Sequence, residues 1–269
     1  MNNLTDASAC YLGPDISPEQ FVAEHLFIFV IEGEMEGFDG QQYLRLEAGS
    51  AVLVRKNRLV HYRKHRQPGR YEKMAVRFDE ALLRRFLERH PKPLATGAAT
   101  DTFVHLQSTD RLAAFVQSLR PYYLGGGQLD PAFAEVKREE LLLLLLQQQP
   151  ELAAILFDFR RPGRLDLESF MATHYKFNVS LERFAFLTGR SLSAFKRDFK
   201  AIFNSSPAAW LVRRRLEEAH FLLTHQATTA SDIYLELGFE DLSHFSFAFK
   251  KQFGYSPRQL QASNTQAAD

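Results

Sequence analysis

One pattern of fifteen residues occurs twice in the chain and restricts the possible folds more than any other feature. The copies are SAFKRDFKAIFNSSP, residues 193–207, and SHFSFAFKKQFGYSP, residues 243–257, so matched positions lie 243 − 193 = 50 residues apart. Both copies carry phenylalanine at every fourth position and end in Ser-Pro. Apolar residues at that spacing share one face of a helix. The repeat therefore predicts two helices of the same design, each buried along its phenylalanine stripe.

A second helix is expected before each copy. LERFAFLTG, residues 181–189, precedes the first, and ASDIYLELGF, residues 230–239, precedes the second with apolar residues at the same offset, Phe184/Tyr234 and Leu187/Leu237. A helix, a short turn and a second helix with an exposed cationic face form the layout of a helix-turn-helix. Tandem helical hairpins are the alternative, but a solenoid usually needs three or more repeats.

A long helix over 207–225 joins the two copies. Ser206 and Ser256 each precede a proline, which makes both serines helix N-caps with proline at the first helical position. At 1.5 Å per residue the joining helix spans roughly 27 Å. Adjacent major grooves on one face of DNA lie roughly 34 Å apart. A rod of this length can hold two helices near groove spacing, which favours DNA as the partner.

The segment LGFEDLSHFSFAFKKQFGYSP, residues 237–257, carries a family signature. It resembles the hallmark of the AraC/XylS family of bacterial transcription regulators: Gly-Phe, a serine-rich helix start, F-x-x-x-F-K-x-x-x-G and Ser-Pro. The resemblance covers residues from about 165 to 261. It implies two helix-turn-helix units on a shared linker helix, both inserting their second helices into double-stranded DNA. It also implies RNA polymerase as a partner and activation of transcription.

Candidate DNA contacts follow position by position from that resemblance. The residues expected to face the bases are Ser193, Lys196, Arg197, Ser243, Ser246 and Phe247. Those expected at phosphates are Lys200, Lys250, Lys251 and Arg190. Arginine and lysine can donate to guanine O6 and N7, whereas phenylalanine can only contact a thymine methyl group. The alternative is that Phe247 covers a neighbouring helix.

The charge of this region is modest. Residues 164–261 contain 13 Lys and Arg against 10 Asp and Glu, which gives 13 − 10 = +3. Arg213, Arg214 and Arg215 on the joining helix either reach phosphates or pair with nearby acids such as Glu217 and Glu218. Because the copies differ at Lys196-Arg197 and Ser246-Phe247, we expect the first unit to supply most of the hydrogen-bonded base readout.

The first half of the chain is predicted to be mainly strands. Short apolar or alternating runs broken by glycines extend from residue 25 to 78, and helical patterns follow over 79–90, 110–124 and 130–149, the last with Asp130 as N-cap. The family resemblance implies a cupin-like β-barrel here, and LEAGSAVLVRKNRLVHY resembles its strand-turn-strand segment. Metal-binding cupins need an H-x-H pair. The sequence lacks that pair, and His61 and His65 alone do not complete a site, so no metal or cofactor is expected.

The barrel interior could hold a small effector. However, RKNR stands at the turn where small-molecule cupins often have proline and glycine, which resembles regulators of secretion systems that respond to proteins. The effector class therefore stays open. The leucines of LLLLLL, residues 141–146, surround their helix, so that helix should be buried on every side, either within its own domain or in a homodimer.

The bulk properties fit a globular protein inside the cell. The single cysteine excludes an internal disulfide and suits a reducing compartment. The N-terminus lacks a signal-peptide pattern, and the six-leucine run is far below the roughly 20 residues of a membrane helix. We therefore expect a cytoplasmic protein without a membrane span.

The sequence thus predicts an α+β protein of two domains. A cupin-like β-barrel with flanking helices, residues 1–157, precedes a linker at 158–164, an all-α domain of two helix-turn-helix units at 165–263, and a disordered tail at 264–269. The expected function is sequence-specific transcription regulation without enzymatic activity. The alternatives are a cupin-type enzyme with a helical appendage and a protein-interaction module.

Overall fold

The chain folds into two compact units. The computed structural model describes residues 8–11, 20–64, 71–91, 101–123, 131–226 and 228–266. The first unit comprises Met1–Ser17 and Phe21–Arg160, and the second comprises Pro18–Gln20 and Arg161–Asp269. The main division, after Arg160, falls inside the segment 158–164 that was predicted as the linker.

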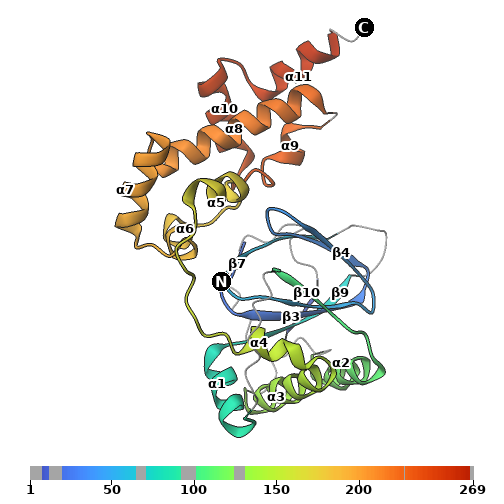
Figure 1. The fold of residues 1–269 in the computed structure, drawn as a ribbon. Helices are drawn as coiled ribbons and strands as arrows, with labels where there is room; N and C mark the ends of the chain where they lie inside the picture. Colours follow the sequence, from blue (N-terminus) through green and yellow to red (C-terminus); the bar gives the residue numbers. More distant parts are fainter. Residues whose placement is uncertain are drawn as a thin grey trace. The chain divides into compact units, whose positions relative to one another are not determined.

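The first unit is built on antiparallel strands (Figure 1). A five-stranded sheet has the order β1-β9-β3-β6-β10, and smaller sheets have the orders β5-β4-β8 and β2-β7. The strands are β1 (Ser8–Tyr11), β2 (Phe21–Val22), β3 (His25–Glu32), β4 (Glu34–Phe38), β5 (Tyr43–Glu47), β6 (Ala51–Val54), β7 (Arg58–Leu59), β8 (His61–Lys64), β9 (Glu72–Phe78) and β10 (Phe103–Leu106).

The sheets do not close into the β-barrel that the family resemblance implied. Among the described residues, no strand of the five-stranded sheet pairs with a strand of the three-stranded one. Side chains hold these two sheets together instead. A buried apolar cluster joins residues of β3 and β6, such as Ile28 and Val52, to residues of β4 and β5, such as Met35 and Leu46. Face-to-face packing satisfies the apolar faces without hydrogen bonds between the sheet edges.

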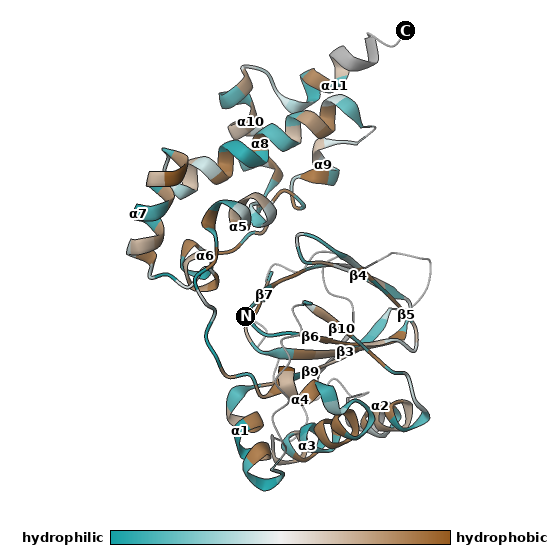
Figure 2. Ribbon diagram, in the orientation of Figure 1, coloured by the Kyte–Doolittle hydropathy of each residue, from teal (hydrophilic) through white to brown (hydrophobic). Residues whose placement is uncertain are grey.

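The opposite face of the five-stranded sheet is covered by helices (Figures 1 and 2). Because side chains alternate along a strand, β3 directs Phe27 and Phe29 towards the helices and Ile28 and Val30 towards the smaller sheet. The helices are α1 (Glu80–Arg89), α2 (Asp110–Tyr123), α3 (Pro131–Gln148), the 3-10 turn η1 (Pro150–Leu152) and α4 (Ala153–Leu156). The sequence patterns did not predict β1, β2, β10 or α4. The predicted cap Asp130 lies outside the described residues.

The leucine-rich helix α3 is not buried on every side, contrary to the prediction. Four of its six consecutive leucines lie in the core, but Leu143 remains 36% exposed and Val136, seven residues earlier, is 63% exposed. Positions seven residues apart lie close to the same helix face. One narrow apolar stripe of α3 therefore faces solvent, while four of the leucines pack into the core cluster with α2 and the sheet.

His25 gives the first unit a specific sensitivity to acid. It is almost fully buried at the start of β3, and its Nδ1 accepts a hydrogen bond from the Lys56 backbone N–H at 3.3 Å. Burial, followed by the charges of Lys56 and Arg55, lowers the pKa of His25 from 6.5 to about 3. Below pH 6.5 the unfolded chain takes up a proton that the folded unit does not. The folded unit therefore loses stability as the pH falls from 6.5 towards 3.

We expect His25→Gln to remove this dependence. Between pH 7 and pH 5 the wild-type unit should lose about 2 kcal/mol more stability than the variant, because a pKa difference contributes about 1.4 kcal/mol per pH unit in that window. Hydrogen exchange of the β3 amides at the two pH values measures the local unfolding free energy. Equal pH dependence in the two proteins would contradict the role given to His25.

The second unit is entirely helical in its described residues (Figure 1). Its helices are α5 (Leu167–His174), α6 (Leu181–Leu187), α7 (Leu192–Phe203), α8 (Pro207–His225), α9 (Ala230–Ile233), α10 (Leu242–Phe253) and α11 (Pro257–Gln266). Ser206 caps α8 as predicted, since its side chain accepts from the Ala209 N–H, and the Ser256 hydroxyl accepts from the Gln259 N–H at 3.3 Å. Helix α11 includes residues 264–266, which were predicted as part of a disordered tail.

The two helix-turn-helix units differ by one residue in their turns. Gly189 and Gly238 both adopt left-handed backbone conformations, with φ of 65° and 81°. In the first helix-turn-helix, Ser191 caps the next helix two residues after the glycine. In the second helix-turn-helix, Asp241 caps the next helix three residues after the glycine. The helices before the turns therefore match at an offset of 238 − 189 = 49, not 50.

This shift corrects the pairing predicted upstream of the repeat. At an offset of 49, Phe184 corresponds to Ile233 and Thr188 to Leu237, and all four residues are buried. The predicted pair Phe184/Tyr234 joins a fully buried residue to a half-exposed one. The regular part of the second upstream helix is also shorter than predicted, because α9 ends at Ile233 and turns follow it.

Candidate nucleic-acid interface

Helix α7 separates its buried and exposed faces as predicted. Phe195 and Phe199 are fully buried, and Trp210 of α8 packs on Phe199 with a ring-centroid distance of 5.6 Å. The opposite face exposes all four residues of this helix that were predicted to contact DNA: Ser193, Lys196, Arg197 and Lys200. The side chain of Arg197 is 75% exposed. One face of α7 therefore offers hydroxyl and cationic donors to a partner outside the unit.

Helix α10 presents a different surface at the same positions. Ser243, Lys250 and Lys251 are exposed, and Phe247 is 70% exposed, so Phe247 does not cover a neighbouring helix. Ser246 is only half-buried at the wall of a shallow groove of about 310 Å³, which Arg258 of α11 also lines. The exposed face of α10 therefore combines an aromatic ring with two lysines instead of the Lys-Arg pair of α7.

Arg190 does not lie on this surface, which corrects its prediction as a phosphate contact. Its side chain is 8% exposed. Its Nη1 donates to the carbonyl oxygens of Leu165 and Thr188 at 2.9 and 2.8 Å, and its Nε donates to Asp198 at 3.2 Å. The guanidinium connects the turn of the first helix-turn-helix to the segment before α5. A largely buried cation engaged by these three acceptors is a structural group of the fold.

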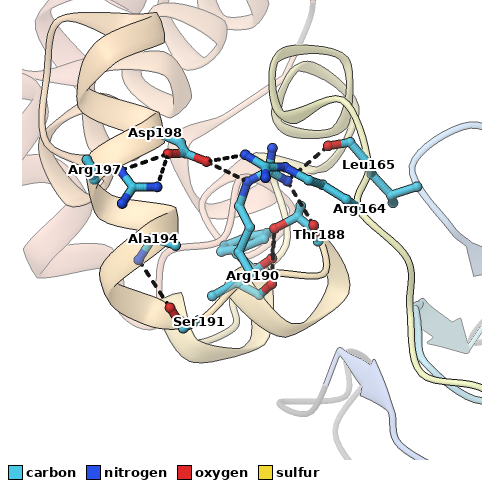
Figure 3. Close-up of polar contacts among 10 residues, drawn as sticks. Arg164, Leu165, Thr188, Arg190, Ser191, Ala194, Arg197 and Asp198 are labelled. Atoms are coloured by element: carbon cyan, nitrogen blue, oxygen red, sulfur yellow. Dashed lines mark hydrogen bonds and ion pairs between the residues drawn. The ribbon is translucent and has the colours of Figure 1, made fainter.

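Asp198 collects a cluster of arginines beside the candidate surface (Figure 3). Arg164, from the segment before α5, reaches its Oδ2 at 2.9 Å, and Arg190 reaches the same atom. Arg197 donates from Nε and Nη2 to Oδ1 at 3.2 and 3.0 Å. Neither Arg164 nor Asp198 was predicted as part of this surface, although an acid directly after Lys196-Arg197 indicates an internal partner for the cationic face.

The three arginines of α8 have separate roles. Arg215 is buried and donates three hydrogen bonds to carbonyl oxygens: Nε to Tyr175 at 2.7 Å, Nη2 to Phe177 at 2.8 Å and Nη1 to Gly238 at 2.8 Å. Tyr175 and Phe177 belong to the first helix-turn-helix region and Gly238 to the second. Arg215 therefore links the two helix-turn-helix motifs from inside the second unit, with its donors engaged by protein carbonyl oxygens. Arg213 and Arg214 remain exposed near Glu217, at 3.9 and 3.5 Å.

No other kind of site is apparent in the described part of the chain. Those residues contain no group of three or more His, Cys, Asp or Glu side chains that could hold a metal ion. His61 lies in β8 and is half-buried, whereas His65 lies outside the described residues. No helix among the described residues is both long and apolar enough to cross a bilayer.

Two family profiles match the chain in sequence. The profile described as the ExsA N-terminal regulatory domain matches residues 25–155, and a helix-turn-helix domain profile matches residues 184–263. The matched ranges correspond to the strand-rich unit and to the surface formed by α7 and α10. The chain is thus built from a regulatory domain and a double helix-turn-helix domain.

Similar proteins share this organisation. The chain is 27% identical to the HTH-type transcriptional regulator ExsA of Pseudomonas aeruginosa over 85% of this chain and 82% of ExsA. It is 34% identical to the virulence regulon transcriptional activator VirF of Yersinia enterocolitica, in an alignment that covers 47% of this chain and 48% of VirF. With its signature residues 237–257, the second unit carries a helix-turn-helix domain of the AraC type, and the chain is similar to transcription regulators of that family.

Solved structures with similar folds are more distant. The apo form of a ToxT variant from Vibrio cholerae is 12% identical with a TM-score of 0.47, over 97% of this chain and 98% of ToxT. The DNA-binding domain of AdpA in complex with a target DNA is 24% identical with a TM-score of 0.35, over 36% of this chain and 87% of that domain.

Proposed function

We propose that this protein is a sequence-specific transcription activator that inserts α7 and α10 into adjacent major grooves of double-stranded DNA. The observation that carries the proposal is the pair of exposed polar faces on these helices, each standing on a buried phenylalanine stripe. The similarity to the transcriptional regulator ExsA and to the transcriptional activator VirF supports both the function and the proposal of activation. The DNA-binding domain is taken as residues 165–263.

The connection between the two helices supports this arrangement. Both α7 and α10 pack against α8, whose 19 residues span about 27 Å at a rise of 1.5 Å per residue. Arg215 fastens both units to that helix through carbonyl oxygens of each. A rigid frame of this length suits the roughly 34 Å between successive major grooves on one DNA face.

The two helix-turn-helix motifs should recognise DNA differently. Lys196 and Arg197 can donate hydrogen bonds to guanine, and Ser193 can bond either base or phosphate. In the second unit, Phe247 can contact a thymine methyl group. The lysines at 200, 250 and 251 are exposed and form no ion pair among the described residues, so they are suited to phosphates. We propose base readout mainly by α7, and positioning with one thymine contact by α10.

We assign the regulation of DNA binding to the strand-rich first unit, mainly residues 21–160. Its match to a regulatory domain supports this, and the space between its sheets is filled by buried side chains such as Val52 and Val54. A small effector would have to displace that packing, so we favour a protein effector. The exposed stripe of Val136 and Leu143 on α3 is proposed as a homodimer contact. RNA polymerase is proposed as the protein partner at the promoter. The cytoplasm is proposed as the location of the protein.

Selection of binding sites from a random duplex library with the full-length protein tests the function. Replacing Arg197 by Ala should cost about 1–3 kcal/mol on the selected site, confined to one base position of one half-site, because a bidentate guanine contact is lost. Affinities for single-base variants of the site at fixed salt give the position. A loss that is equal on every sequence would identify Arg197 as a phosphate contact instead.

Phe247→Arg provides the matched exchange in the second unit. It should change base preference in the other half-site only, since Phe247 and Arg197 occupy equivalent helix positions. Lys251→Ala should weaken binding to all duplexes similarly and reduce the salt dependence by about one counterion. If full-length protein enriches no sequence at moderate salt, or if Lys196 and Arg197 can both be replaced without loss, the protein-interaction alternative gains.

A further inference from the structure

The carboxylate of Asp198 is held in place on the side facing the protein interior. Its side chain is 16% exposed, and its Oδ2 bonds the buried Arg190, which is itself fixed by the carbonyl oxygens of Leu165 and Thr188 (Figure 3). Hydrogen bonds from Arg197 and then Arg190 hold the pKa of Asp198 below its usual range, so the carboxylate is ionised near neutral pH. A charged acceptor with a rigid support therefore stands beside the exposed face of α7.

Arg197 uses only part of its guanidinium on this acceptor. Its Nε and Nη2 both donate to Oδ1 of Asp198, and its Nη1 has no hydrogen-bond partner among the residues that the structure describes. The side chain is still 75% exposed. A guanidinium carries five N–H donors in a planar fork, so a group engaged along one edge retains donors for O6 and N7 of a guanine.

The second helix-turn-helix shows that the motif can form without such a network. Phe239 follows Gly238 as Arg190 follows Gly189, and it is buried against Phe245 with a ring-centroid distance of 5.1 Å. Ala248 stands at the position equivalent to Asp198, beside Phe247, which has no hydrogen-bonding group to orient. The same turn is thus built once from apolar groups and once from a charged network, and the network occurs where an arginine is exposed.

We infer that Asp198 is a positioning residue for DNA reading, which holds the Arg197 guanidinium in the orientation that bonds a guanine. The inference rests on the proposed DNA-binding function. Restricting a long side chain before binding reduces the conformational entropy lost on contact with the base. A carboxylate near DNA also repels phosphates, so Asp198 lowers affinity for DNA in general while raising it for sites with the correct guanine.

Asp198→Asn tests this pair of opposite effects. Full-length wild type and variant are titrated with the selected site and with a scrambled duplex of the same length at the same salt. The ratio of the two affinities should fall about tenfold in the variant, as expected for a weakened bidentate base contact. Affinity for the scrambled duplex should stay the same or rise. Loss of a merely structural group would lower both affinities together.

A double-mutant cycle with Arg197→Ala gives the second readout. If Asp198 acts through Arg197, Asp198→Asn should cause no further loss of the ratio in the Arg197→Ala background. Losses that multiply, or an unchanged ratio in the single variant, would overturn the inference. Arg164→Gln is the matched control, because it removes another cation from the same carboxylate and should leave the ratio unchanged.

Two further arms keep the result interpretable. Asp198→Glu retains a negative charge beside the buried Arg190 but displaces the acceptor by one methylene, so its ratio should also fall even if Asp198→Asn proves unstable. A wild-type protein that enriches no sequence from the library defeats the proposed function itself. A wild type that selects a site while both Asp198 variants keep its full ratio defeats only the role of Asp198.

Discussion

Gly238→Ala is expected to destabilise the second unit by about 3–5 kcal/mol, since it combines backbone strain with steric overlap. Gly238 has φ of +81°, and a Cβ there would lie 2.5 Å from the carbonyl oxygen of Lys176 and 2.8 Å from Cζ of Arg215. The backbone oxygen cannot move without shifting the turn after α5. Displacement of Arg215 would also break the hydrogen bonds that join the two helix-turn-helix units.

The matched control is Gly254→Ala. Gly254 has a similar φ of +85°, but a Cβ there would meet nothing within 4 Å. Its substitution should therefore cost only the strain of the left-handed conformation, about 1–2 kcal/mol. Trp210 is the single tryptophan and lies 4.8 Å from the Phe203 ring, so its fluorescence during urea unfolding reports on the second unit of the full-length protein. Equal losses in the two variants would show that close packing at Gly238 is unimportant.

Arg215→Met is expected to cost about 3–5 kcal/mol, because it removes a buried charged donor from three carbonyl oxygens. Methionine keeps the aliphatic stem but leaves the oxygens of Tyr175, Phe177 and Gly238 without this donor. Burial lowers the pKa of Arg215 only to about 10, so the guanidinium remains charged at neutral pH. The three carbonyl dipoles are its compensation inside the unit.

The neighbouring Arg214→Met separates this effect from a general loss of charge. Arg214 is about half-exposed, lies 5.1 Å from the Tyr175 ring centroid and forms an exposed ion pair with Glu217 at 3.5 Å, so its replacement should cost about 1 kcal/mol or less. The Trp210 fluorescence assay measures both variants. In addition, a folded fraction of Arg215→Met should bind two-half-site DNA more weakly than wild type, because the link between the units is lost. Comparable stabilities for Arg214→Met and Arg215→Met would contradict the bridging role.

The local features of the DNA-binding unit could be predicted from the sequence because they depend on short-range rules. Serine before proline specified the starts of α8 and α11, and the spacing of phenylalanines specified which faces of α7 and α10 are buried. The exposure of Arg197 followed directly from those faces, whereas the exposure of Phe247 was left open by the sequence and was decided by the structure. Each of these inferences needs only helix geometry and the chemistry of a few adjacent residues.

Predictions that required partners distant in the chain were less successful. Arg190 reads as one more surface cation until Leu165 and Thr188 are placed beside it, and Arg215 resembles its neighbours until Gly238 approaches it. The prediction of a closed β-barrel was wrong for the same reason, since barrel closure depends on whether the edge strands of the sheets meet in space. The matched offset of 50 also concealed the extra turn residue in the second unit, because hydrogen bonds rather than letters define the turn.

The amino-acid sequence by itself determined the duplicated helix-turn-helix, its capping residues and the asymmetry between Lys196-Arg197 and Ser246-Phe247. Only the tertiary structure decided which arginines are available to DNA and which hold the protein together. The physical reason is that a guanidinium has the same chemistry in either role. Its function depends on the acceptors that folding brings within hydrogen-bonding distance: carbonyl oxygens for Arg190 and Arg215, and Asp198 together with open solvent for Arg197.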